Sequence, residues 1–218
     1  MSLMFCDSYD HYAVTSDKWT NGGGASNNDL TGTLSRTGIG CGVLNGVLAP
    51  SYGIAAGLGP FYTGCAMNLS ALNGGGRPCS FRGGGNLLCA IQVQANGSIV
   101  IQSVASGYQS AESAPGLVAA LDYAYFELSC VLTPAGGSNA TVTATARING
   151  FVVLGPVSYN VGYPTIDQIY PEGPGGGATG YIDDFYLCNG LGTHDNGFLG
   201  AVRIYSGTPV ADSTPLSQ

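Results

Sequence analysis

Alternation of apolar and polar residues with a period of two is the feature that most restricts what this chain can fold into. In ATVTATARI, residues 140–148, apolar side chains alternate with threonines and one arginine. Successive side chains of a strand point to opposite faces, so this stretch predicts a strand with one buried face. Asn149-Gly150 follows, and then FVVL, residues 151–154. Asn-Gly between two such runs predicts a β-hairpin, because both turn residues need a positive φ.

The same period recurs along the chain. LLCAIQVQANGSIVIQS, residues 87–103, predicts a second hairpin that turns at Asn96-Gly97, with Cys89, Ile91, Val93 and Ala95 inward and Gln92 and Gln94 outward. Further strands are expected at 4–6, 41–48, 65–69, 123–132, 181–188 and 198–206. No long stretch has a helical period. The predicted fold class is therefore all-β, an antiparallel β-sandwich or jelly roll, with one domain over 1–206 and a polar C-terminal tail over 207–218.

The amino-acid composition limits the classes of partner that the protein can bind. Only 9% of the 218 residues are charged, against about 25% in typical proteins, so we expect neighbouring subunits to cover much of the surface and the chain to form a homo-oligomer. The alternative is a surface solvated by a coat of Ser, Thr and Asn side chains. The net charge of −7 and five scattered arginines argue against nucleic acid. No membrane partner is expected, because no run of about 18 apolar residues occurs.

The N-terminal segment lacks a secretory signal, so the seven cysteines are expected as buried thiols rather than disulfides.

Two adjacent carboxylates, Asp183 and Asp184, interrupt the apolar run GYIDDFYLCNG, residues 180–190. A regular strand places neighbours on opposite faces, so Asp183 is expected with Tyr181, Phe185 and Leu187, and Asp184 with Ile182, Tyr186 and Cys188. This separation disfavours a glycosidase pair, whose carboxyls flank one bond. A structural role, in which a buried aspartate accepts backbone N–H groups, is favoured. A calcium site at Asp183 and Asp184 is the weaker alternative.

Other catalytic patterns are weak. The glutamates are Glu112, Glu127 and Glu172, and the two histidines, His11 and His194, are expected at edges or in loops. No Gly-x-Ser-x-Gly elbow occurs. A polysaccharide-cleaving site would require Glu127 beside a second carboxylate in a groove. From these residues we expect no enzymatic activity and no cofactor, with calcium as the one ion considered.

The order of motifs resembles one family. FCDSYDHYA near the start, the strand before QANGSIVI, YAYFELSCVL, TATARINGFVVL and YIDDFYLCNGLGTHDNGFLGAVRIYS together are similar to the laminin-G-like, concanavalin A-like jelly-roll proteins of tailed bacteriophages. The resemblance covers roughly residues 4 to 206 and implies a sandwich of two antiparallel sheets. Its fold markers correspond here to Ile182, Asp183, Asp184, Asn149, Gly150, Asn196, Phe198, Leu199 and Gly200.

The resemblance also implies a function. It suggests a non-enzymatic structural protein of the virion, assembled in the host cytoplasm. Such a protein would be a many-copy capsid decoration or cement protein, or a tail or baseplate subunit, and would bind major capsid or tail subunits. The alternative is a lectin-like adhesin that binds surface glycans during host attachment, since relatives outside phages bind calcium and glycans on rim loops. The many tyrosines suit sugar stacking or protein interfaces, but for most of them filling of the sandwich core is the favoured explanation.

Overall fold

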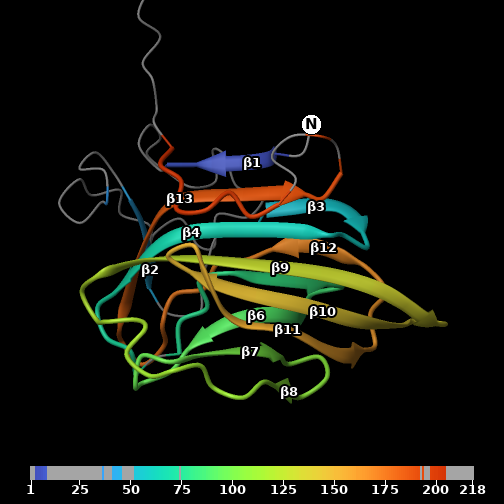
Figure 1. Cartoon of the computed structure of the whole chain (residues 1–218), viewed down its shortest axis with the longest axis horizontal. Helices are drawn as coiled ribbons and strands as arrows, with labels where there is room; N and C mark the ends of the chain where they lie inside the picture. Colours follow the sequence, from blue (N-terminus) through green and yellow to red (C-terminus); the bar gives the residue numbers. More distant parts are fainter. Residues whose placement is uncertain are drawn as a thin grey trace, which may run out of the picture.

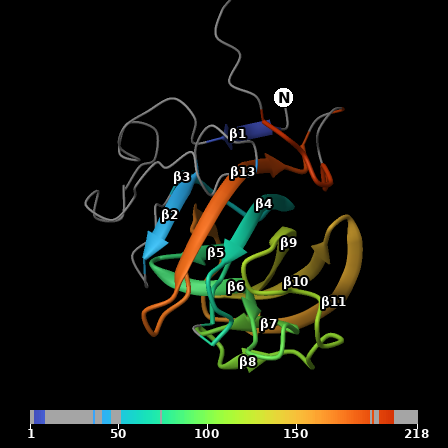
Figure 2. The ribbon, with the colours of Figure 1, turned by 90° about the vertical axis from the view of Figure 1, so that its left-hand side faces the viewer.

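The computed structural model describes residues 3–8, 36, 41–45, 52–73, 75–191, 193 and 197–204. These residues form thirteen strands in two antiparallel sheets and contain no helix, which confirms the all-β sandwich. Figures 1 and 2 show the two layers. In the part of the chain that the structure describes, no helix has the length and apolar character needed to cross a membrane.

The seven-stranded sheet has the order β1-β13-β4-β9-β10-β11, and β2 and β1 lie along the same edge of β13. Its members are β1 (Leu3–Asp7), β2 (Gly42–Asn45), β4 (Phe61–Leu69), β9 (Tyr123–Gly136), β10 (Asn139–Ile148), β11 (Phe151–Val161) and β13 (Thr179–Asn189).

The six-stranded sheet has the order β3-β12-β5-β6-β7-β8. Its members are β3 (Tyr52–Gly57), β5 (Ser80–Gly83), β6 (Asn86–Val93), β7 (Ile99–Ser103), β8 (Tyr108–Gln109) and β12 (Ile166–Ile169). The apolar residues of the predicted alternation fill the space between the two sheets, among them Ile91, Phe126, Val142 and Phe185. Burial of this core drives folding, at about 25 cal/mol per Å² of apolar surface.

Both predicted hairpins are confirmed. Asn149 and Gly150 have φ values of 51° and 85° and join β10 to β11. Asn96-Gly97 joins β6 to β7, where Gln94 N–H donates to Ser98 O at 2.8 Å. One detail is wrong: Ala95 is exposed rather than inward, because the turn begins there.

The strands predicted near 4–6, 65–69, 123–132 and 181–188 are confirmed within β1, β4, β9 and β13, and residues 42–45 of the predicted strand 41–48 form β2. The strand predicted at 198–206 is wrong for 198–204, which the structure shows without strand pairing. Both edges of β13 are occupied, by β1 and β2 on one side and β4 on the other, so this segment cannot pair with β13. His11, His194, Asn196, residues 46–48 and the 207–218 tail lie outside the described residues.

Candidate functional site

The two adjacent aspartates lie at a β-bulge. Between Asp183, opposite Ala66, and Tyr186, opposite Gly64, β13 contains one residue more than β4. The extra residue is Asp184, with a φ of 49°. A bulge changes which face the following residues occupy. Phe185 and Leu187 therefore join Ile182 in the core, whereas Tyr186 and Cys188 pack with Ala66 on the outer face.

This bulge corrects the expectation that the two carboxylates point to opposite faces, because both bind Arg36. Asp183 Oδ2 accepts the Arg36 backbone N–H at 3.0 Å, and Asp184 Oδ2 accepts Arg36 Nη1 at 2.7 Å. Asp184 Oδ1 also accepts the Ile204 N–H at 2.7 Å. The carboxylates thus hold backbone and guanidinium donors. Among the described residues, no group of three or more His, Cys, Asp or Glu side chains is placed to bind a metal ion.

Glu127 lies beside this bulge on the same outer face and is fully buried. Its Oε1 accepts Tyr186 Oη at 2.7 Å and Gly200 N–H at 2.8 Å, and Arg147 Nη1 lies 3.7 Å from its Oε2. Burial, with the nearby Glu127 charge, raises the pKa of Tyr186 well above its usual range. The Tyr186 hydroxyl therefore stays protonated and donates its hydrogen bond to Glu127.

Residues 198–204, which we name the strap, cover this face. Phe198 lies edge-on to Tyr62, with ring centroids 5.1 Å apart, and beneath the Arg147 guanidinium. Leu199 and Val202 pack on the cluster around Tyr125 and Tyr186. The predicted fold markers Phe198, Leu199 and Gly200 thus close the sheet, and Glu127 faces the strap rather than an open groove.

A more accessible polar cluster lies on the outer face of the six-stranded sheet, and we name it the arginine face. Antiparallel pairing of β12, β5, β6 and β7 brings its residues side by side across the sheet. Gln168 lies opposite Arg82, Ser80 opposite Ala90, and Ala90 opposite Gln102. Arg77 continues β5 and forms an isolated bridge with Glu172. The arginine face consists of Arg77, Arg82, Gln92, Gln102, Gln168, Tyr170 and Glu172.

One buried carboxylate holds both arginines of this face. Glu172 Oε2 accepts from Arg77 Nη1, and its Oε1 accepts Arg82 Nη2 at 2.5 Å. The Glu172 side chain is 3% exposed, whereas those of Arg77 and Arg82 are 22% and 24% exposed. Two positive charges against one negative leave a local surplus of positive charge. The planar guanidinium groups are therefore fixed in place but remain within reach of a ligand.

Two glutamines and a tyrosine extend the network. With its amide oriented by the hydrogen bonds, Gln102 donates to Gln92 Oε1 at 2.8 Å and accepts from Arg77 Nε at 2.5 Å. The Arg82 guanidinium lies 4.4 Å from the centroid of the Tyr170 ring. The face thus combines cationic donors, amides and an aromatic ring, a combination that binds carboxylates and sugar hydroxyls.

The sequence pattern does not reveal this cluster, and along the chain the arginines are scattered. Arg77, Arg82 and Glu172 come from two segments about 90 residues apart, and only the β12–β5 pairing brings them together. One signal is present: the outward orientation predicted for Gln92 is consistent with its place on this face.

Comparison with solved structures identifies the fold. Alginate lyase Aly36B matches with a TM-score of 0.55 and 13% identity, over 84% of this chain and 95% of the lyase. The endo-β-1,4-glucuronan lyase of the fungus Trichoderma reesei matches with a TM-score of 0.53 and 11% identity, over 85% of this chain and 95% of that one. The binding domain of Paraclostridial Mosquitocidal Protein 1 matches with a TM-score of 0.51 and 12% identity, over 86% of this chain and 48% of that one.

These matches define the class of protein as a jelly-roll β-sandwich, which is the fold that the family resemblance implies. They give no support to its virion part. No family model and no curated protein matches the sequence. The expectation of a non-enzymatic protein is contradicted, because two of these nearly full-length fold neighbours are enzymes. A shared fold with enzymes does not by itself assign an activity.

Proposed function

We propose that the protein recognises an acidic polysaccharide on the arginine face. The observation that carries this proposal is the pair of partly exposed arginines held by one buried glutamate, beside two amides and a tyrosine ring. A sugar carboxylate accepts charged hydrogen bonds from guanidinium groups, and the amides pair with neighbouring hydroxyls. The proposal keeps the glycan-binding alternative that the sequence suggests and names the class of glycan.

Charge supports short-range recognition rather than long-range attraction. The chain carries a net charge of −7, so it does not draw a polyanion from a distance. The surplus charge of Arg77 and Arg82 acts at hydrogen-bonding distance, where a positioned guanidinium discriminates a carboxylate from a hydroxyl. We therefore expect selectivity for the acid over the neutral polymer with the same backbone.

Cleavage of that polysaccharide by β-elimination is the second candidate. In this reaction the C5 proton is removed, a C4–C5 double bond forms and the C4–O bond to the next sugar breaks, so the site must neutralise the sugar carboxylate, remove that proton and give a proton to the leaving oxygen. Arg82 and Tyr170 lie together on the arginine face and are the residues that we propose for these roles. The lyases among the structural neighbours motivate this candidate, and the same polymers test it through the ultraviolet absorbance of an unsaturated uronate product.

The test compares glucuronan oligosaccharides with cello-oligosaccharides, which share a backbone and differ in the C6 carboxylate. By isothermal calorimetry we expect binding of the acidic series only. Arg82→Gln should weaken it about tenfold or more, because a charged hydrogen bond contributes roughly 1.5–3 kcal/mol. Glu172 keeps Arg77 in this variant, so the fold should persist, and the thermal transition checks this.

Arg203→Gln is the matched control, because Arg203 is exposed on the strap, on the other sheet, and the charge change is the same. Its affinity should stay within about twofold of the wild type. Equal binding of the acidic and neutral series, or equal losses in the two arginine variants, would contradict the proposal.

A further inference from the structure

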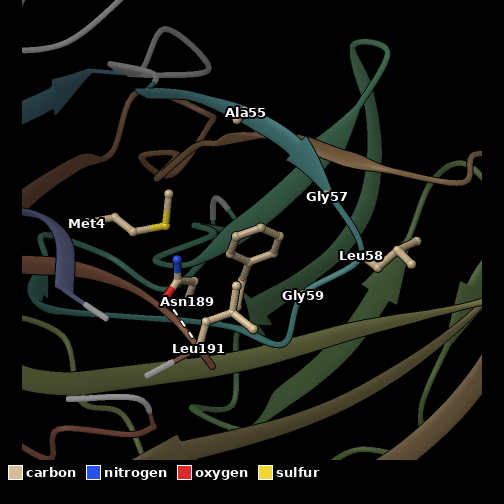
Figure 3. Close-up of a pocket in the computed structure, with 8 residues that line it drawn as sticks. Met4, Ala55, Gly57, Leu58, Gly59, Asn189 and Leu191 are labelled. Carbon is tan, nitrogen blue, oxygen red and sulfur yellow. Dashed lines mark hydrogen bonds between the residues drawn. The ribbon is translucent and has the colours of Figure 1, made fainter. Parts of the chain in front are cut away.

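An apolar pocket of about 260 Å³ opens at one end of the sandwich. Met4, Ala55, Gly57, Leu58, Phe61 and Leu191 line it, with Asn189 as its polar member. Figure 3 shows Met4, Ala55 and Leu191 around the same space. None of the lining residues is charged. An engineered cavity of about 150 Å³ lined by similar residues binds benzene, so this pocket has room for an aromatic ring.

An apolar protrusion lies at the tip of the β10–β11 hairpin. Phe151 is 74% exposed and Val152 is 61% exposed, directly after the Asn149-Gly150 turn. The turn is firmly held: Asn149 exchanges hydrogen bonds with Tyr125, and Arg147 Nε donates to Gly150 O at 3.1 Å. A rigid protrusion loses little entropy when it binds.

The protrusion and the pocket lie at opposite ends of the seven-stranded sheet. Phe61, at the pocket, lies opposite Cys130 of β9, whereas the hairpin end at Ile148 lies opposite Phe126. In Figure 1 the β10–β11 turn is at the left and the β3–β4 connection at the right. One molecule therefore cannot fill its own pocket with its own hairpin tip.

We propose that the tip of one copy, Phe151 and Val152, inserts into the apolar pocket of a second copy. Phe151 and Val152 are apolar and exposed, and the pocket is apolar and has room for a ring. A contact between two different surfaces of identical chains is heterologous, and it leaves a tip and a pocket free at the ends. The assembly therefore grows head to tail, into a ring if the rotation closes and into an open filament otherwise.

Complementation of two variants tests this geometry by sedimentation velocity. Phe151→Ser removes the tip and leaves the pocket, and Ala55→Glu places a charge in the pocket and leaves the tip. The wild type should form species larger than 22.1 kDa that increase with concentration, because one anchor gives a small, weak interface. Each variant alone should be a monomer.

An equimolar mixture of the two variants should form a dimer of twice the monomer mass and nothing larger, because one tip and one pocket remain. Val104→Glu is the control, since Val104 is 65% exposed but lies at neither surface, and it should associate like the wild type. A wild type that stays monomeric at millimolar concentration, variants that associate unchanged, or a mixture that stays monomeric would each overturn the proposal. Circular dichroism checks that every variant is folded.

Discussion

Asp184 shows how one residue redirects a strand. A non-glycine residue with positive φ is uncommon, and aspartate and asparagine tolerate it better than most residues. The extra residue shifts the inward–outward alternation of the β13 side chains by one position. Tyr186 therefore contacts Glu127, and Phe185 enters the core. A regular strand is the expectation from sequence, and the pattern of YIDDFYLC contains no signal that separates the two cases.

Replacing Asp184 separates its backbone and charge contributions. Asp184→Asn should lower the free energy of unfolding by about 1–3 kcal/mol, because Arg36 and the Ile204 N–H lose a charged acceptor. Asp184→Ala should cost about 1–2 kcal/mol more, since alanine disfavours the left-handed conformation. Urea denaturation measures both. Asp167→Asn is the control, at an exposed carboxylate that accepts the Gly84 N–H, and it should change the free energy of unfolding by less than either Asp184 variant. If Asp184→Ala were as stable as Asp184→Asn, this account of the backbone contribution would be refuted.

At the scale of elements, local pattern predicts the strands well and their neighbours poorly. The hairpins are predictable because their signals lie within about 20 residues. The strap is apolar enough to be expected as a strand, but it packs across the outer face of the seven-stranded sheet without strand pairing. The arginine face depends on the pairing of β12 with β5, a long-range contact that no periodicity reports.

Packing between neighbouring strands predicts a specific sensitivity in β4. Gly64 lies opposite Tyr186 and Glu127, and a Cβ at this glycine would overlap the Tyr186 ring. Gly64→Ala should therefore displace Tyr186 from Glu127 and destabilise the fold by about 1–3 kcal/mol. Gly162→Ala is the control, because a Cβ at Gly162 would meet nothing within 4 Å, and it should change the thermal transition little. Similar transitions for both variants would count against this packing.

At the scale of the whole molecule, scarce charge favours a surface covered by neighbours. The location in a virion and the capsid or tail partners stay predictions, and a calcium site stays the weaker alternative. The seven cysteines are thiols in the structure, and six are buried. Burial raises the pKa of the Cys79 thiol well above its usual value, which suppresses the reactive thiolate.

Thiol titration tests this arrangement. In the native protein, a chromogenic disulfide reagent should react first with half-buried Cys6, and the six buried thiols should react only as fast as the fold opens. In denaturant without reductant, all seven should react. A reducing agent should leave the thermal transition unchanged. A smaller thiol count in denaturant, restored by reductant, would show a disulfide instead.

The pairing of β1 with β13 joins residues 3–7 to residues 185–188. A ribosome makes the first of these strands long before the second. During synthesis, β1 therefore has no pairing partner until almost all of the other described strands have left the ribosome. The carboxylates of Glu127 and Asp184 lack one hydrogen-bond donor each for even longer, until the backbone N–H groups of residues 200 and 204 have been made. The seven-stranded sheet is thus completed only after β13 and the strap have been made.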